Sequence, residues 1–130
     1  MKSAELKQRT KQFALRVIRL TDSLPRRMSA DVLGRQLLRS ATSVAANYRS
    51  ACRAKSRADF ISKMGTVEEE ADESALWLEL IGESQLMKPA KLSALHQEAE
   101  ELTAIAVASI RTARRASSIP QSAVRNPPSK

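Results

Sequence analysis

The stretch QLLRSATSVAANYRSACR, residues 36–53, decides the fold class, because on a helix its side chains separate into two distinct faces. It contains three arginines and no acidic residue among small, apolar and neutral polar side chains. Successive side chains of a helix are about 100° apart. On a helix that includes this stretch and the residues just before it, the apolar side chains lie on one side: Leu33, Leu37, Ala41, Val44 and Tyr48. Arginines gather on the other side, and we call them the arginine stripe: Arg35, Arg39, Arg49 and Arg53, with Arg57 next if the helix continues. One face is therefore expected to pack and the other to be basic.

The composition favours helices throughout. A chain of 130 residues suits one domain, and its 3% aromatic content requires a core of aliphatic side chains. Three glycines and five prolines leave few interruptions, and Pro25 and Pro89 separate periodic segments. Apolar spacings of three and four residues predict helices at about 4–24, 30–55, 57–86 and 90–116. Short joints then predict an antiparallel up-down four-helix bundle over residues 1–116. The Ser- and Pro-rich segment 117–130 is expected to be a disordered basic tail.

The cellular setting follows from what the sequence lacks. Cys52 is the only cysteine, so no internal disulfide can form, and its place at the flank of the apolar face predicts a small packing residue. The charged N-terminus has no signal-peptide pattern, and no segment has 18 uninterrupted apolar residues. We therefore expect a cytoplasmic protein.

Charge is segregated along the chain. Residues 1–56 carry 13 basic and 3 acidic side chains, whereas residues 57–85 carry 2 basic and 8 acidic. The net charge of +8 and the basic first half are typical of proteins that bind nucleic acid. The cations of the first helix point in several directions around it, so they indicate a general positive electrostatic field rather than one binding site. They are Lys7, Arg9, Lys11, Arg16 and Arg19. Alternatively, the acidic run VEEEADE, residues 67–73, pairs with the arginines within or between subunits.

No pattern indicates catalysis or a bound cofactor. His96 is the only histidine and no Glu precedes it by three residues, so the Glu-x-x-His pattern of di-iron bundles is missing. Glu69 and Glu73 share a helix face, but two carboxylates on one solvated helix do not make a metal site. The glycines are isolated within helical patterns, which favours close helix approach over phosphate binding. We expect a protein that is not an enzyme and holds no metal or cofactor.

A second apolar set lies away from the expected core. Leu76 and Leu80 fall on the outer side of the third helix, with Trp77 between them and the core, and Leu15 lies opposite Leu6 on the first helix. Outer apolar clusters are usually covered, so we expect Leu15, Leu76, Trp77 and Leu80 to form an interface between copies of the chain. Single exposed leucines are also common on monomers, and that alternative stays open.

Ser43 and Asn47 lie four residues apart, between the apolar face and the arginine stripe. We interpret them as structural polar residues that bond a neighbouring backbone or bridge to the acidic third helix. A tie from Arg39 to the cluster of Glu69, Glu70 and Glu73 would be similar. A nucleic-acid contact through Asn47 is the alternative.

The segments VLGRQLLRSATSVAANYRSACRAKSRADFISKM (residues 32–64) and EADESALWLELIGES (residues 70–84) resemble the four-helix-bundle family that includes the 23S rRNA intervening-sequence protein. The opening helix ELKQRTKQFALRVIRL, with LP at 24–25, fits the same family, so the resemblance covers about residues 5–86. It implies a homo-oligomeric ring of four-helix subunits, a pentamer. A relative, the accessory variability protein of diversity-generating retroelements, is associated with nucleic acid and a reverse transcriptase.

Two hypotheses of function remain. In the first, the ring is a scaffold whose repeated arginine stripes contact phosphates of RNA or DNA, with Arg35, Arg39, Arg49, Arg53 and Arg57 as the contacting residues. The scarcity of aromatic side chains favours a duplex, structured RNA or an RNA–DNA hybrid over single strands. In the second, the arginines serve assembly and the outer surface recruits a protein, for example a reverse transcriptase or a ribosomal partner.

Overall fold

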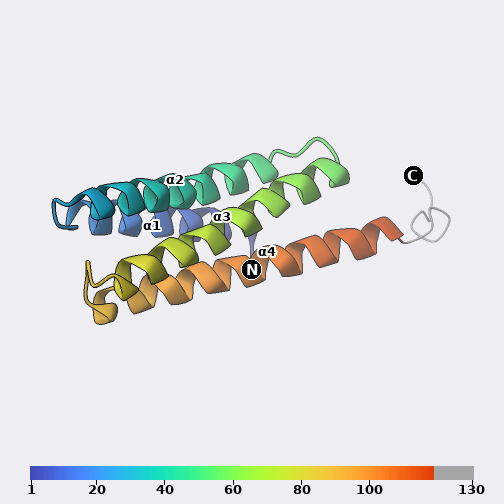
Figure 1. Ribbon diagram of the computed structural model, residues 1–130. Coiled ribbons are helices and arrows are strands. Elements are labelled where there is room, and N and C mark those ends of the chain that lie inside the picture. Colours follow the sequence, from blue (N-terminus) through green and yellow to red (C-terminus); the bar gives the residue numbers. More distant parts are fainter. Residues whose placement is uncertain (119–130) are drawn as a thin grey trace, which may run out of the picture.

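The computed structural model describes residues 1–118, and within that range it contains four helices and no strand. They are α1 (Ser3–Asp22), α2 (Met28–Ala51), α3 (Arg57–Glu83) and α4 (Pro89–Ser118). Each of the three connections between them has only five residues, so consecutive helices pack side by side in alternating directions (Figure 1). The predicted all-α four-helix bundle is confirmed. The predicted tail lies outside the described residues, except that α4 continues through Ser118.

The helix ends differ from the predicted bounds by at most four residues, and the predicted start of α3 at residue 57 is confirmed. At the start of α3, the Asp59 backbone N–H donates to Ser56 Oγ at 3.0 Å, and the Lys55 N–H donates to Asp59 Oδ2 at 3.1 Å. Lys63 donates to the same carboxylate at 2.9 Å. The bond from Lys63, with that from the Lys55 N–H, holds the pKa of the Asp59 carboxyl below its ordinary value. Gln85, with a φ of 64°, is the left-handed residue that follows the end of α3.

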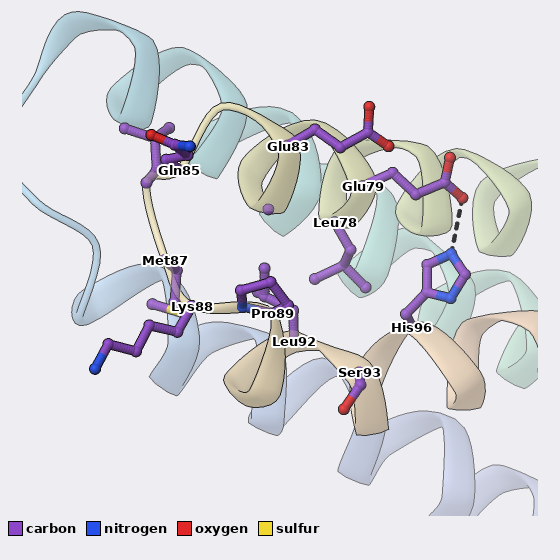
Figure 2. A pocket seen from close by; sticks show the side chains of 12 residues that line it. Leu78, Glu79, Glu83, Gln85, Met87, Lys88, Pro89, Leu92, Ser93 and His96 are labelled. Carbon is purple, nitrogen blue, oxygen red and sulfur yellow. Dashed lines mark hydrogen bonds and ion pairs between the residues drawn. The ribbon is translucent and has the colours of Figure 1, made fainter.

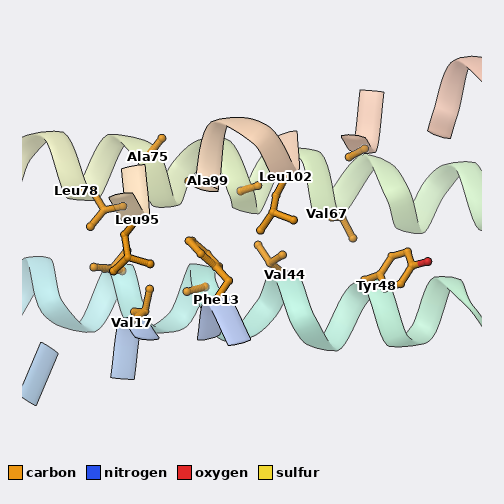
Figure 3. Packing of buried hydrophobic residues seen from close by; sticks show 14 of the residues in the cluster. Phe13, Val17, Val44, Tyr48, Val67, Ala75, Leu78, Leu95, Ala99 and Leu102 are labelled. Carbon is orange, nitrogen blue, oxygen red and sulfur yellow. The ribbon is translucent and has the colours of Figure 1, made fainter. Parts of the chain in front are cut away.

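All four helices contribute to one aliphatic core. Figure 3 shows Phe13 and Val17 of α1, Val44 of α2, Leu78 of α3 and the side chains of α4 directed into the same interior. Small residues also belong to the core, and Ala41, Ala71, Ala99 and Ala106 are fully buried. Each large buried side chain contributes about 1.5–3 kcal/mol to folding. This burial orients α1 and α2 and thereby fixes which side chains face outward.

A polar pair lies inside the core. Ser40 of α2 and Ser74 of α3 are both inaccessible to solvent, and their hydroxyl oxygens are 2.8 Å apart. Each hydroxyl is also within bonding distance of a carbonyl one turn back, on Leu37 and Glu70 respectively. The pair therefore sets the register of α2 against α3 without leaving a buried hydroxyl unsatisfied.

The expected close approach at glycines holds for two of the three. A methyl group on Gly34 would lie 3.1 Å from Leu24 Cδ1, and one on Gly82 would lie 3.1 Å from Leu92 Cδ1. Gly65 has open space, since nothing comes within 4 Å of such a methyl group.

The expectation for Cys52 is wrong, because its thiol is exposed. The helix α2 ends at Ala51, so Cys52 lies just beyond it and not on the packing face. Burial, with a smaller contribution from Cys52, raises the pKa of the Tyr48 hydroxyl above its ordinary value. None of the helices within residues 1–118 has the length and apolarity needed to cross a membrane.

Candidate nucleic-acid interface

All members of the arginine stripe are exposed, but they do not continue along one helix. Arg35, Arg39 and Arg49 lie on the outer face of α2, whereas Arg53 belongs to the connection 52–56. Arg57 is the first residue of α3. The condition for Arg57 to continue the stripe on the same helix is therefore not met, because the Ser56 cap starts α3 at residue 57, where a new helix was predicted.

Arg39 is occupied by acidic side chains of α3. Its Nη1 lies 3.2 Å from Glu70 Oε2 and its Nη2 lies 2.7 Å from Glu73 Oε1. Bonding to Glu70, supported by Glu73, raises the pKa of the Arg39 guanidinium. Within the described residues, Glu69 does not take part. Arg39 therefore ties α2 to α3 and is not free to bind a ligand while this ion pair holds.

The remaining members of the stripe are different. The side chains of Arg35, Arg49, Arg53 and Arg57 make no hydrogen bond or ion pair with any residue that the structure describes. Their guanidinium groups present up to five donors each to the surroundings. Such planar groups suit phosphate oxygens, which they can contact with two parallel bonds.

A basic hollow between α1 and α2 was missed by the sequence analysis. We call it the α1–α2 groove; it has a volume of about 470 Å³ and is lined by Ala4, Lys7, Gln8, Lys11, Ala45, Ala46 and Arg49. Lys7 and Lys11 are one turn apart on α1, so their spacing was visible in the sequence. Their convergence with Arg49 depends on how α1 packs against α2, which the spacing does not reveal.

Arg9 does not belong to this surface. Its Nε lies 2.7 Å from Glu98 Oε2 and its Nη2 lies 2.6 Å from Glu101 Oε1 on α4. Bonding to Glu98 raises the pKa of Arg9 despite partial burial, and Gln97 and Arg9 lower the pKa of Glu101. This cluster joins the first helix to the last, which contact each other less extensively than consecutive helices do.

Ser43 and Asn47 bond each other within α2. The Asn47 side-chain amide donates to the Ser43 carbonyl at 2.9 Å and to Ser43 Oγ at 2.8 Å. The bond to the Ser43 carbonyl is the neighbouring-backbone contact that the sequence predicted as one of two possibilities; the other, a bridge to α3, is not formed among the described residues. The i, i+4 spacing favours the local bond, because both side chains project from the same strip of α2.

The predicted interface residues differ in exposure. Leu76 and Leu80 are 44% and 38% exposed, whereas Leu15 and Trp77 are half-buried. The buried Nε1 of Trp77 has no hydrogen-bond partner in the described part of the chain. Further exposed apolar side chains, which the sequence analysis did not single out, lie on α1 and α2 at Ile18, Met28 and Val32.

A larger hollow lies at the connection between the end of α3 and the start of α4 (Figure 2). It has a volume of about 870 Å³, with an apolar floor that includes Leu78 and Leu92. Glu83 lies at its rim, and His96 Nε2 is 2.7 Å from Glu79 Oε2. No group of three or more side chains within residues 1–118 is arranged to hold a metal ion. The lining of this partly apolar hollow includes Lys88 as well as the two carboxylates, whereas the ionisable groups of the α1–α2 groove are all cations.

The fold and surface define an all-α, four-helix-bundle protein whose unpaired stripe arginines lie on α2, in the connection 52–56 and at the start of α3. The chain belongs to the 23S rRNA-intervening sequence protein family, whose sequence model matches residues 2–108. It is also similar to a crystal structure of a protein of unknown function from the S23 ribosomal protein family of Bacteroides thetaiotaomicron. The two are 32% identical with a TM-score of 0.79, over 85% of this chain and 99% of the other. No curated protein matches the chain.

Proposed function

We propose that this protein is a non-enzymatic scaffold that binds RNA or DNA through phosphate contacts. The observation that carries the proposal is that four of the five stripe arginines are exposed and unpaired among the described residues: Arg35, Arg49, Arg53 and Arg57. The family's name refers to a 23S rRNA intervening sequence, which supports a role connected with RNA. Phosphate contacts are insensitive to base sequence and weaken steeply with salt.

The ligand that fits best is a duplex or a structured RNA. Recognition of single strands relies on exposed aromatic rings on which bases stack. Phe13 and Tyr48 are buried in the core, and Phe60 and Trp77 pack against it. These are all of the aromatic side chains in the chain, so no stacking platform exists.

We further propose that copies of the chain assemble into a closed ring, a pentamer as the family resemblance implies. Leu76 and Leu80 provide apolar area on α3 for the contact, together with the half-buried Trp77 of the same helix and the half-buried Leu15 of α1. A ring repeats the free arginines by symmetry, so that weak phosphate contacts add to a strong one. Light scattering of a Leu76→Asp/Leu80→Asp variant tests the interface, and an unchanged assembly size would exclude these residues from it.

The binding experiment uses fluorescence anisotropy of labelled duplex RNA and DNA, titrated with salt. Replacing Arg35, Arg49, Arg53 and Arg57 by Gln should reduce the slope of log K against log salt for duplex DNA by about 3.6 for each copy whose four arginines all contact phosphates. A matched control replaces four exposed cations of α4 and of the connection before it: Lys88, Lys91, Arg111 and Arg114. Their side chains bond no described residue. Equal loss in both variants would indicate only a general effect of net charge, and no binding at low salt would refute the proposal.

The second candidate is a protein-interaction scaffold that recruits a partner such as a reverse transcriptase or a ribosomal protein. The exposed Leu76 and Leu80 favour it, because the same surface could hold a different protein instead of a second copy. This hypothesis is supported if the Leu76→Asp/Leu80→Asp variant keeps its assembly size and nucleic-acid affinity, because the two leucines are then needed for neither and can hold a different protein.

A further inference from the structure

We propose that the α1–α2 groove binds the sugar–phosphate backbone of one strand of a nucleic acid, with Lys7, Lys11 and Arg49 as the phosphate contacts. The inference rests on the proposed function, which it narrows from a basic face to one site. It also adds two residues of α1 that lie outside the arginine stripe.

The three cations enclose a real hollow. Lys7 and Lys11 project from α1 about 6 Å apart along the helix axis, and Arg49 lines the same groove from α2. The floor is low because Ala4, Ala45 and Ala46 carry only methyl groups. The volume of about 470 Å³ lies within the range of small-ligand sites in proteins.

The groove concentrates positive charge without compensation. No acidic residue lines it, and none of its three cations has a bonded partner in the described residues. Elsewhere the chain pairs its cations where carboxylates are in reach, as at Arg9, Arg39 and Lys63. Three like charges around one hollow repel each other, and a polyanion seated there would remove that cost.

The chemistry of the lining favours phosphates over an acidic protein. Protein interfaces usually have a desolvated apolar centre, but this groove has no side chain larger than Ala that is apolar. It has instead ammonium and guanidinium donors, which suit phosphate oxygens, and the amide of Gln8. The unpaired Arg53 follows Arg49 on the chain, so a backbone that leaves the groove at this end meets a further cation.

The test compares three variants by salt-dependent anisotropy with a labelled duplex DNA. The groove variant carries Lys7→Gln, Lys11→Gln and Arg49→Gln. The stripe variant carries Arg35→Gln, Arg53→Gln and Arg57→Gln. The control variant carries Lys88→Gln, Lys91→Gln and Arg114→Gln. For the groove variant, we expect the salt slope to fall by about 2.7 for each copy that touches the duplex, the value for three lost phosphate contacts. The control should change the slope little. Circular dichroism and light scattering show whether each variant keeps its fold and assembly.

The outcomes separate this inference from the proposed function. If the groove variant binds like the wild type while the stripe variant loses affinity, the groove inference is wrong and the proposed function stands. If the wild type does not bind at low salt, both are wrong. A competition experiment adds polyglutamate or polyphosphate of equal charge to the complex of the protein with the labelled duplex. If polyglutamate competes as well as polyphosphate does, the groove is a general polyanion surface and the phosphate assignment is overturned.

Discussion

Freeing Arg39 should strengthen nucleic-acid binding. Arg39 lies on the same exposed face of α2 as Arg35 and Arg49, but its guanidinium is held by Glu70 and Glu73 at 3.2 and 2.7 Å. The variant Glu70→Gln/Glu73→Gln keeps the side-chain shapes and removes both negative charges. Arg39 would then be able to contact a phosphate as the other stripe arginines are proposed to do.

The size of the effect follows from one additional phosphate contact in each copy that touches the ligand. For duplex DNA, the slope of log K against log salt should steepen by about 0.9 for each such copy, so that a fourfold drop in salt raises the affinity about 3.5-fold more than in the wild type. The Arg39 side chain is 51% exposed, so loss of the ion pair should cost only about 0–1 kcal/mol of stability. The fold should therefore survive.

The assay is anisotropy with labelled duplex between about 50 and 200 mM salt, the range over which phosphate contacts dominate the change in affinity. A control variant, Glu68→Gln/Glu83→Gln, removes the same charge from two carboxylates of α3 that bond no described residue. An equal gain in both variants would mean that net charge alone acts. An unchanged slope in the Glu70→Gln/Glu73→Gln variant would refute the reasoning that the ion pair withholds Arg39 from the ligand.

Three further predictions concern the bundle itself. Gly65→Ala should raise stability by about 0.8–1 kcal/mol from helix propensity, since its methyl group meets nothing within 4 Å; Gly34→Ala should gain less, because its methyl group lies 3.1 Å from a leucine of the α1–α2 turn. Chemical denaturation of both variants at several protein concentrations measures this, and a Gly65→Ala variant that is less stable would point to a contact between copies. Arg9→Gln should cost about 1–2 kcal/mol, the range of a charge-assisted bond, because its partly buried guanidinium joins α1 to α4; an unchanged denaturation midpoint would contradict this. Since the pKa of Asp59 is lowered in the folded protein, the stabilisation by its carboxylate is complete above the ordinary pKa and is lost as pH falls through the lowered one. Asp59→Asn should therefore lower the melting temperature at about pH 7 and have much less effect at about pH 2, and an equal effect at both values would contradict the assignment.

The sequence by itself determined the secondary structure and the inner face of each helix. Period-3.6 spacing placed Leu37, Ala41 and Val44 in the core, and the structure buries all three. The same period put the stripe arginines of α2 on the opposite face, since the angle between two side chains on one helix depends only on their separation in sequence. The motif at Ser56 and Asp59 likewise formed a local cap, because capping bonds span only three or four residues.

Only the tertiary structure decided which cations are free. Arg9 and Arg39 are occupied by carboxylates that lie 89 and 31 residues away along the chain, whereas Lys7, Lys11 and Arg49 meet around a groove with no acid in it. Similarly, Gly34 and Gly82 lie against leucines while Gly65 faces open space. Helical period fixes the direction in which a side chain leaves its own helix, but its neighbours depend on the rotation and axial shift of the next helix. Those two quantities result from the packing of the whole core, to which all four helices contribute at once.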